Sequence, residues 1–198
     1  MENMLQFIRS RRSTRKFLDK PLEREKLDMI LDAGRHAPSG GNNQLTHFIV
    51  ITNKEVLAEL AALVKHELSL MEYHEGMYKS LAMSIASAKK ESYFFHYNPA
   101  ALVVTANQRG YGNAMVDCAC ALENMMLMTN ALDLGSCWIN HLRWLQDNEN
   151  AIAFMQKLGM AEGEYVCGAL SIGYPDTESG LPARTPLPRT GNSVTYID

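Results

Sequence analysis

Two kinds of apolar pattern alternate along this chain. In the first, apolar residues recur every three or four positions, which is the spacing of one helical face. This pattern predicts helices over 3–10, from Pro21 to Gly34, and over 55–70, 114–132 and 148–158. In the second, short runs rich in β-branched and aromatic residues are bounded by polar ones, and they predict strands over 47–52, 101–105, 136–139 and 165–172. Strands interleaved with longer helices indicate an α/β or α+β domain of three layers.

The predicted helix over 114–132 differs from the others because apolar residues cover nearly all of its faces. We expect Asn113 to cap its first turn, since Asn is a preferred capping residue. A helix that is apolar all round is buried on all sides. We therefore expect this helix to lie at the centre of the domain and at a subunit interface.

The C-terminal tail has a different composition, because it contains four of the seven prolines of the chain. Such a segment buries little surface by itself, so residues 174–198 are expected to wrap over a partner subunit. No repeat or linker interrupts the sequence, which predicts a single domain over 1–198.

Composition narrows the possible functions. Of the 198 residues, 46% are hydrophobic and 21% are charged, as in an ordinary globular protein, and the net charge of -3 provides no positive field for nucleic acid. No apolar run approaches the ~18 residues of a membrane span. The N-terminus lacks the basic and apolar regions of a secretory signal. We therefore expect a cytoplasmic protein with no nucleic-acid or membrane partner.

The four cysteines and six histidines show no metal-ligand spacing, so no metal is expected. The cysteines are predicted to be buried, reduced thiols. The sequence also lacks a G-x-G-x-x-G pattern after its first strand and a P-loop, which disfavours the Rossmann and P-loop nucleotide folds.

Two short stretches carry the candidate chemistry. Arg11-Arg12-Ser13-Thr14-Arg15 concentrates guanidiniums and hydroxyls, which suit a dianionic phosphate. Ala37-Pro38-Ser39-Gly40-Gly41-Asn42-Asn43-Gln44 is a loop of small residues ending in carboxamides, which suit the mixed edge of a heterocycle. Together they indicate a nucleotide-like cofactor. The plainer alternatives are a solvated basic surface, a turn that ends a helix and, for Trp138 further along, a core residue.

With these stretches the chain resembles the nitroreductase family of FMN-dependent oxidoreductases. The resemblance rests on Arg11 to Phe17, on Ala37 to Gln44, on Leu134-Gly135-Ser136-Cys137-Trp138-Ile139, and on Ile172-Gly173-Tyr174-Pro175 followed by Arg184. It implies an α+β fold of three layers, with a mixed central sheet flanked by helices. It also implies an obligate homodimer with two FMN sites at the subunit interface.

The resemblance further implies roles for individual residues. Arg11, Arg12, Ser13 and Arg184 would hold the FMN phosphate, and Arg15 would reach the pyrimidine edge of the flavin. The partner subunit would contribute Pro38, Ser39, Gly40, Asn42 and Gln44. Trp138, Ile139 and Asn140 would face the flavin near its N5 atom.

The activity that the resemblance implies is hydride transfer from NAD(P)H, through flavin N5, to a small electron-poor acceptor such as a nitroaromatic or a quinone. This reaction needs no catalytic nucleophile or general base, and none is expected. Two alternatives stay open. One is an FMN enzyme of the same fold with another reaction: dehydrogenation, reductive dehalogenation or flavin processing. The other is a non-enzymatic module that binds nucleotides or nucleic acid through the arginines.

The chain departs from the family at two positions. Leu45-Thr46 follows Gln44 where the family often has Pro-Trp, which should reshape one wall of the cofactor pocket. His141 stands where the family often has Gly, and it adds a titratable ring near the predicted flavin.

The stretch over 71–97 is rich in Met, Tyr, Phe and His and is predicted to be partly helical. It is interpreted mainly as packing, with the alternative that it covers the flavin and selects the substrate.

Overall fold

The computed structural model describes residues 2–198, and its centre is a four-stranded sheet with strand order β1-β2-β4-β3. The strands are β1 (His47–Ile51), β2 (Ala101–Gln108), β3 (Gly135–Ile139) and β4 (Glu164–Gly173). All four predicted strands are thus confirmed, and so is the α+β class. Every pairing between these strands is antiparallel. In residues 2–198 parallel pairing occurs only at the isolated Ser13–Ser136 bridge, so the mixed character expected of the sheet is limited to the β3 edge.

The central strands β2 and β4 are buried on both faces, which explains why they are continuous apolar runs rather than alternating ones. Successive side chains of a strand point to opposite faces. Accordingly, Leu102 and Val104 belong to one core cluster, whereas Val103 belongs to a second cluster on the other side. The sheet therefore separates two hydrophobic cores.

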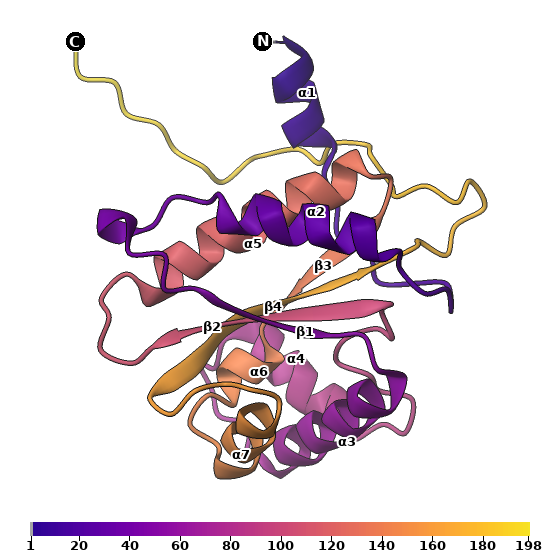
Figure 1. The fold of residues 1–198 in the computed structure, drawn as a ribbon, viewed down its shortest axis with the longest axis vertical. Helices are drawn as coiled ribbons and strands as arrows, with labels where there is room; N and C mark the ends of the chain where they lie inside the picture. The colour runs from indigo at the N-terminus through magenta and orange to yellow at the C-terminus, as the bar shows by residue number, and fades with distance from the viewer. Residues whose placement is uncertain (1) are drawn as a thin grey trace.

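Helices cover both faces of the sheet, as the three-layer prediction requires (Figure 1). One layer contains α2 (Arg24–Arg35) and α5 (Ala114–Ala131). The other contains α3 (Lys54–Leu70), α4 (Lys79–Ala88), α6 (His141–Trp144) and α7 (Glu149–Lys157). Helix α1 (Glu2–Ser10) projects beyond the α2–α5 layer, and the C-terminal tail crosses that side before leaving the body of the molecule (Figure 1).

Side-chain capping fixes the starts of two helices, α3 and α7. Asn53 accepts hydrogen bonds from Glu55 N and Val56 N at the start of α3, and Asn148 accepts one from Ala151 N at the start of α7. Two details of the prediction were wrong. Helix α2 begins at Arg24 rather than at Pro21, and Asn113 precedes α5 without a side-chain capping bond. The short helix α6 was not predicted, because four residues are too few to show a period.

The expectation that α5 is buried on all sides was wrong for the single chain. Its inner face packs on the sheet through residues such as Leu122 and Met125, both fully buried. Its outer face keeps Val116 60% exposed, and Cys120 and Leu127 are only partly buried. The apolar pattern predicts burial correctly but not what buries it, since one chain supplies packing partners for only part of the helix.

Candidate cofactor site

The arginine stretch lies along the outer edge of β3. Thr14 N donates to Ser136 O at 2.8 Å, and Ser13 pairs with Ser136. Gly135 permits this close approach, because a Cβ atom there would lie 2.6 Å from Thr14 Cγ2 and 2.7 Å from Thr14 Oγ1. Residues 11–15 are therefore held against an edge strand rather than free in solution.

The polar side chains of this stretch are accessible. Ser13 and Arg15 are exposed, and Arg11 makes only a long ion pair with Glu123, at 3.9 Å. Burial raises the pKa of the neighbouring Cys137 thiol, and the positive charges of Arg15 and Arg11 oppose that rise. The charges of Arg11 and Arg15 are thus close enough to this edge of β3 to act on one of its side chains.

The C-terminal tail brings one further arginine, Arg184, to the same side of the molecule. Arg12 Nη1 donates to Thr185 O at 2.6 Å, which brings the tail next to the arginine stretch. The neighbouring Arg184 donates to Asn130 O at 2.9 Å and pairs with Asp133. The structure therefore brings Arg184 to the region of Arg11–Arg15, although its guanidinium is engaged at the end of α5.

The end of β3 continues this edge. Because Ser136 O points outward to Thr14, the backbone N–H and C=O of Trp138, two residues on, point outward as well. The Trp138 side chain turns inward to the α2–α5 core and donates to Asn140 Oδ1 at 2.8 Å, whereas Ile139 is buried in the opposite core. Side-chain packing and an open backbone edge are therefore compatible at Trp138.

The second candidate stretch lies elsewhere. Residues 38–44 contain the short 3-10 turn η1 (Gly40–Asn42), and they are anchored beside the N-terminal end of α5. Pro38, Asn42 and Gln44 are exposed, and Ser39 and Gly40 are partly buried. No hydrogen bond or ion pair within residues 2–198 joins this loop to the arginine stretch, and Figure 1 shows η1 on the side of the molecule away from β3. One chain does not bring the two halves together.

The comparison with known proteins settles the family. The sequence model of the nitroreductase family matches residues 8–174. The chain belongs to the nitroreductase family. The resemblance drawn from the sequence is confirmed, and with it the expectation that the protein is an oxidoreductase.

Several relatives of this nitroreductase family member are similar over most of its length. A protein of Archaeoglobus fulgidus, provisionally named NADH dehydrogenase/NAD(P)H nitroreductase, is 30% identical and covers 90% of this chain and 88% of its own. The NADPH-flavin oxidoreductase of Vibrio harveyi is 25% identical over 94% of this chain and 71% of its own. The crystal structure of a nitroreductase with bound FMN from Bacteroides fragilis is 30% identical, covers all of both chains and superposes with a TM-score of 0.85.

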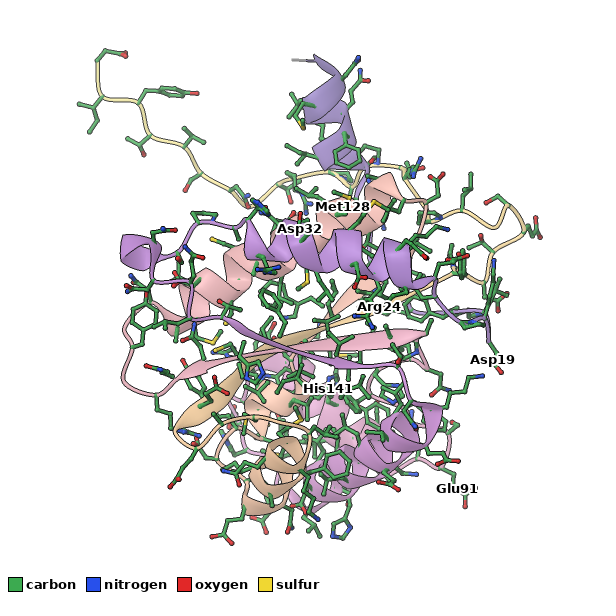
Figure 2. All side chains as sticks on the ribbon, viewed as in Figure 1. Asp19, Arg24, Asp32, Glu91, Met128 and His141 are labelled. Carbon is green, nitrogen blue, oxygen red and sulfur yellow. The ribbon has the colours of Figure 1, made fainter. Side chains whose placement is uncertain are left out.

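His141 does not lie in the arginine-lined region. Its ring is 8% exposed and is enclosed by Tyr93, Phe95 and Trp144, with ring centroids at 6.1, 5.5 and 5.0 Å. Figure 2 labels it in the layer below the sheet. Its Nε2 atom is 3.0 Å from Ser84 Oγ. Burial, reinforced by the nearby His96, lowers the pKa of His141 to about 4, so the ring is neutral at pH 7.

The sequence analysis missed the residues that hold the 38–44 loop. Asp117 and Tyr111 both contact Gly40, and neither was proposed as part of the site. The available signal was a carboxylate in the first turn of the most apolar helix of the chain, since such a group is buried only when donors satisfy it.

Residues 2–198 contain no cluster of three or more His, Cys, Asp or Glu side chains that could hold a metal ion. Over the same residues, no helix is long and apolar enough to cross a membrane. The four cysteines are free thiols, as predicted, and Cys120 alone among them is only partly buried.

Proposed function

We propose that the protein is an FMN-dependent oxidoreductase that uses NAD(P)H to reduce a small electron-poor acceptor, such as a nitroaromatic or a quinone. The observation that carries the proposal is the shared edge of β3. There Ser13 and Thr14 are joined to Ser136, two residues before the outward-facing backbone of Trp138, and Arg11 and Arg15 flank them in the sequence. The family membership and the FMN-bound relative at 30% identity support the same cofactor.

The residues present fit FMN chemically. The exposed and partly buried guanidinium and hydroxyl groups at residues 11–15 would hold its phosphate, and Arg15 would stabilise negative charge at the pyrimidine edge of the ring. The open backbone of Trp138 would donate to or accept from the ring edge. Bound FMN would supply the redox chemistry, taking a hydride at N5 from NAD(P)H and giving it to the acceptor. The protein would orient the reactants and exclude water, and it would supply no nucleophile or base.

We also propose that the protein acts as a homodimer in which each site combines both chains. The exposed face of α5, the exposed apolar residues Met4, Leu5 and Ile8 of α1, and the extended tail lie on the same side of the sheet and support an interface there. The exposed carboxamides of Asn42 and Gln44 would then complete the partner's site, with Pro38 and Ser39 lining it.

The first test is the visible absorbance spectrum of the purified protein, with the released chromophore identified by mass. We expect a flavin spectrum and the mass of FMN. Steady-state double-reciprocal plots for NAD(P)H and the acceptor should be parallel, because both substrates would use one position in turn. A colourless protein that takes up no added FMN would contradict the proposal.

A second test separates the two halves of the site. Arg15→Ala impairs one half, and the double substitution Asn42→Ala with Gln44→Ala impairs the other. If each site uses both chains, a heterodimer of the two variants has one site built from two unaltered halves and one built from two altered halves. Random subunit exchange makes about half of the dimers heterodimers, so mixing the inactive variants should restore up to about a quarter of the sites. No recovery after verified subunit exchange would argue for sites built from single chains.

A second acceptor class is favoured by one comparison. The Vibrio harveyi relative is named an NADPH-flavin oxidoreductase, so free flavin belongs among the acceptors to be tested. Faster turnover with added free FMN than with any nitroaromatic or quinone would favour flavin reduction as the activity.

A further inference from the structure

Gly40, at the centre of the 38–44 loop, is held by two side chains from outside the loop. Its N–H donates to Asp117 Oδ1 at 3.0 Å, and its carbonyl oxygen accepts from the Tyr111 hydroxyl at 3.1 Å. Tyr111 also donates to Asp117 Oδ2 at 2.9 Å, so the three residues form a closed hydrogen-bonded group. Asp117 is 4% exposed and lies in the first turn of α5.

We propose that Asp117 and Tyr111 are positioning residues that hold the 38–44 loop in the conformation that binds the cofactor. This inference rests on the proposed function, since it assumes that the loop contributes to an FMN site. Both side chains would act through Gly40, to which each is hydrogen-bonded.

The loop needs an external anchor because its backbone is strained. Gly41, Asn42 and Gln44 have φ angles of 59°, 56° and 53°, in the left-handed region. For residues other than Gly this region costs roughly 1–2 kcal/mol each. The bonds from Asn42 N to Ser39 O and from Gln44 N to Ser39 Oγ lie within the loop and do not fix it to the domain. A loop held only by these bonds would have other conformations of similar energy.

Within residues 2–198, all hydrogen bonds that join 38–44 to the rest of the chain end on Asp117 or Tyr111. They are the two bonds to Gly40 and a longer one from Asn43 Nδ2 to the Tyr111 hydroxyl, at 3.4 Å. Losing these two side chains would therefore leave the loop without a polar connection to the described domain.

Electrostatics and the close packing at Gly40 both favour the hydrogen-bonded group of Gly40, Tyr111 and Asp117. The N-terminal turn of a helix stabilises a carboxylate, and the N–H of Gly40 and the hydroxyl of Tyr111 satisfy both oxygens of Asp117. Tyr111 has a single hydroxyl hydrogen for two acceptors, and the charged oxygen attracts it more strongly. At Gly40, a Cβ atom would lie 2.0 Å from Asn113 Nδ2 and 2.7 Å from the Tyr111 hydroxyl, so a side chain there would displace both.

A purely structural role would have a different signature. If Asp117 only stabilised α5, its loss would lower the melting temperature and leave the affinity of the folded protein for FMN unchanged. In our proposal Asn42 and Gln44 are exposed on a loop that is already ordered before FMN binds. Loss of the anchor would therefore add the free energy of ordering the loop to the free energy of FMN binding.

The experiment compares Asp117→Asn and Tyr111→Phe with the wild-type protein. Asp147→Asn is the matched control, because it makes the same chemical change on an exposed carboxylate paired with Arg109. FMN affinity is measured by flavin fluorescence after reconstitution, and loop mobility by the rate of tryptic cleavage after the exposed Arg35. We expect about tenfold weaker FMN binding for Asp117→Asn, the size of one charged hydrogen bond. Cleavage should be faster, and the control should match the wild type.

The effects of the two substitutions should also be less than additive in the double variant, because both remove the same hydrogen-bonded group. Wild-type affinity and wild-type cleavage in both single variants would overturn the inference and leave the proposed function standing. A wild-type protein that binds no FMN would overturn the proposed function instead. If Asp117→Asn does not fold, Tyr111→Phe, which removes one oxygen atom, decides the question alone.

Discussion

At the scale of single residues, the burial of His141 makes the free energy of unfolding depend on pH. Its pKa of about 4 in the folded protein lies below the ordinary value of 6.5, so the unfolded chain binds a proton more readily between these pH values. The free energy of unfolding therefore falls as pH drops from 6.5 to 4, and the stabilisation is complete only above 6.5. The shift corresponds to about 3 kcal/mol.

We predict that His141→Phe removes that part of the pH dependence, because Phe keeps an aromatic ring among Tyr93, Phe95 and Trp144 and cannot titrate. Urea unfolding at pH 7 and pH 4.5 measures the difference. His36→Gln, at an exposed position, is the control and should keep the wild-type profile. Equal pH dependence in His141→Phe and wild type would refute the assignment.

Gly135 controls the attachment of the arginine stretch to β3. A Cβ atom at this position would overlap Thr14, whose own backbone is bonded to Ser136. We expect Gly135→Ala to displace residues 11–15. The overlap should lower the free energy of unfolding by about 1–3 kcal/mol, and the free energy of FMN binding should fall by at least as much. Paired titrations of FMN and denaturant provide the measurement. An affinity equal to that of Gly112→Ala, where a Cβ atom meets nothing, would contradict the prediction.

At the scale of elements, Glu67 joins α3 to α7. Its buried carboxylate accepts from Asn148 Nδ2 and Asn150 Nδ2, each at 2.7 Å, and these bonds lower the pKa of Glu67 despite its burial. We predict that Glu67→Ala lowers the free energy of unfolding by about 2 kcal/mol at pH 7, because both amides lose their acceptor. The loss should shrink as pH falls toward the pKa of the folded carboxyl, where the wild type also loses the charge. Chemical denaturation tests this, with the exposed Glu59→Ala as control.

The segment around α4 combines packing with an exposed aromatic surface. The packing interpretation of 71–97 holds for the buried Phe95, but Tyr73, Tyr78 and Phe94 are 66%, 63% and 44% exposed. Tyr78 stands edge-on to Trp144, with centroids 6.3 Å apart, so it extends this surface to α6, the helix that follows β3 in the chain.

We predict that Tyr78→Ala changes the ratio of kcat/KM between a nitroaromatic and a quinone while altering stability by less than about 0.5 kcal/mol, as expected of an exposed side chain. Steady-state kinetics with both acceptors and a melting curve measure the two effects. Unchanged rates on every acceptor in the Tyr73, Tyr78 and Phe94 alanine variants would count against a substrate-selecting surface.

At the scale of the whole molecule, the exposed stripe of α5 is where a second chain would pack. We predict that Val116→Glu yields a monomer with weakened FMN binding, because a charge would be buried in the proposed interface. Light scattering at micromolar concentration gives the mass, and flavin fluorescence gives the affinity. Val50→Glu, on the exposed face of β1, is the matched control. A wild-type monomer would refute the dimer, and with it the contribution of Asn42 and Gln44 to a partner's site.

The sequence by itself determined the family and most of the elements, and it supplied the donor set on which the proposed cofactor site rests. Apolar periodicity predicts helices and strands locally, because the side-chain repeat of each element is a property of its own backbone. The donor set of Arg11, Ser13 and Arg15 is likewise contained in five consecutive residues. Only the tertiary structure decided what depends on distant contacts. It joined Gly40 to Asp117 across 77 residues, buried His141 in the core below the sheet, and left the loop and the arginines apart within one chain. No local pattern encodes such pairings, because each arises only when the helices have packed on the sheet.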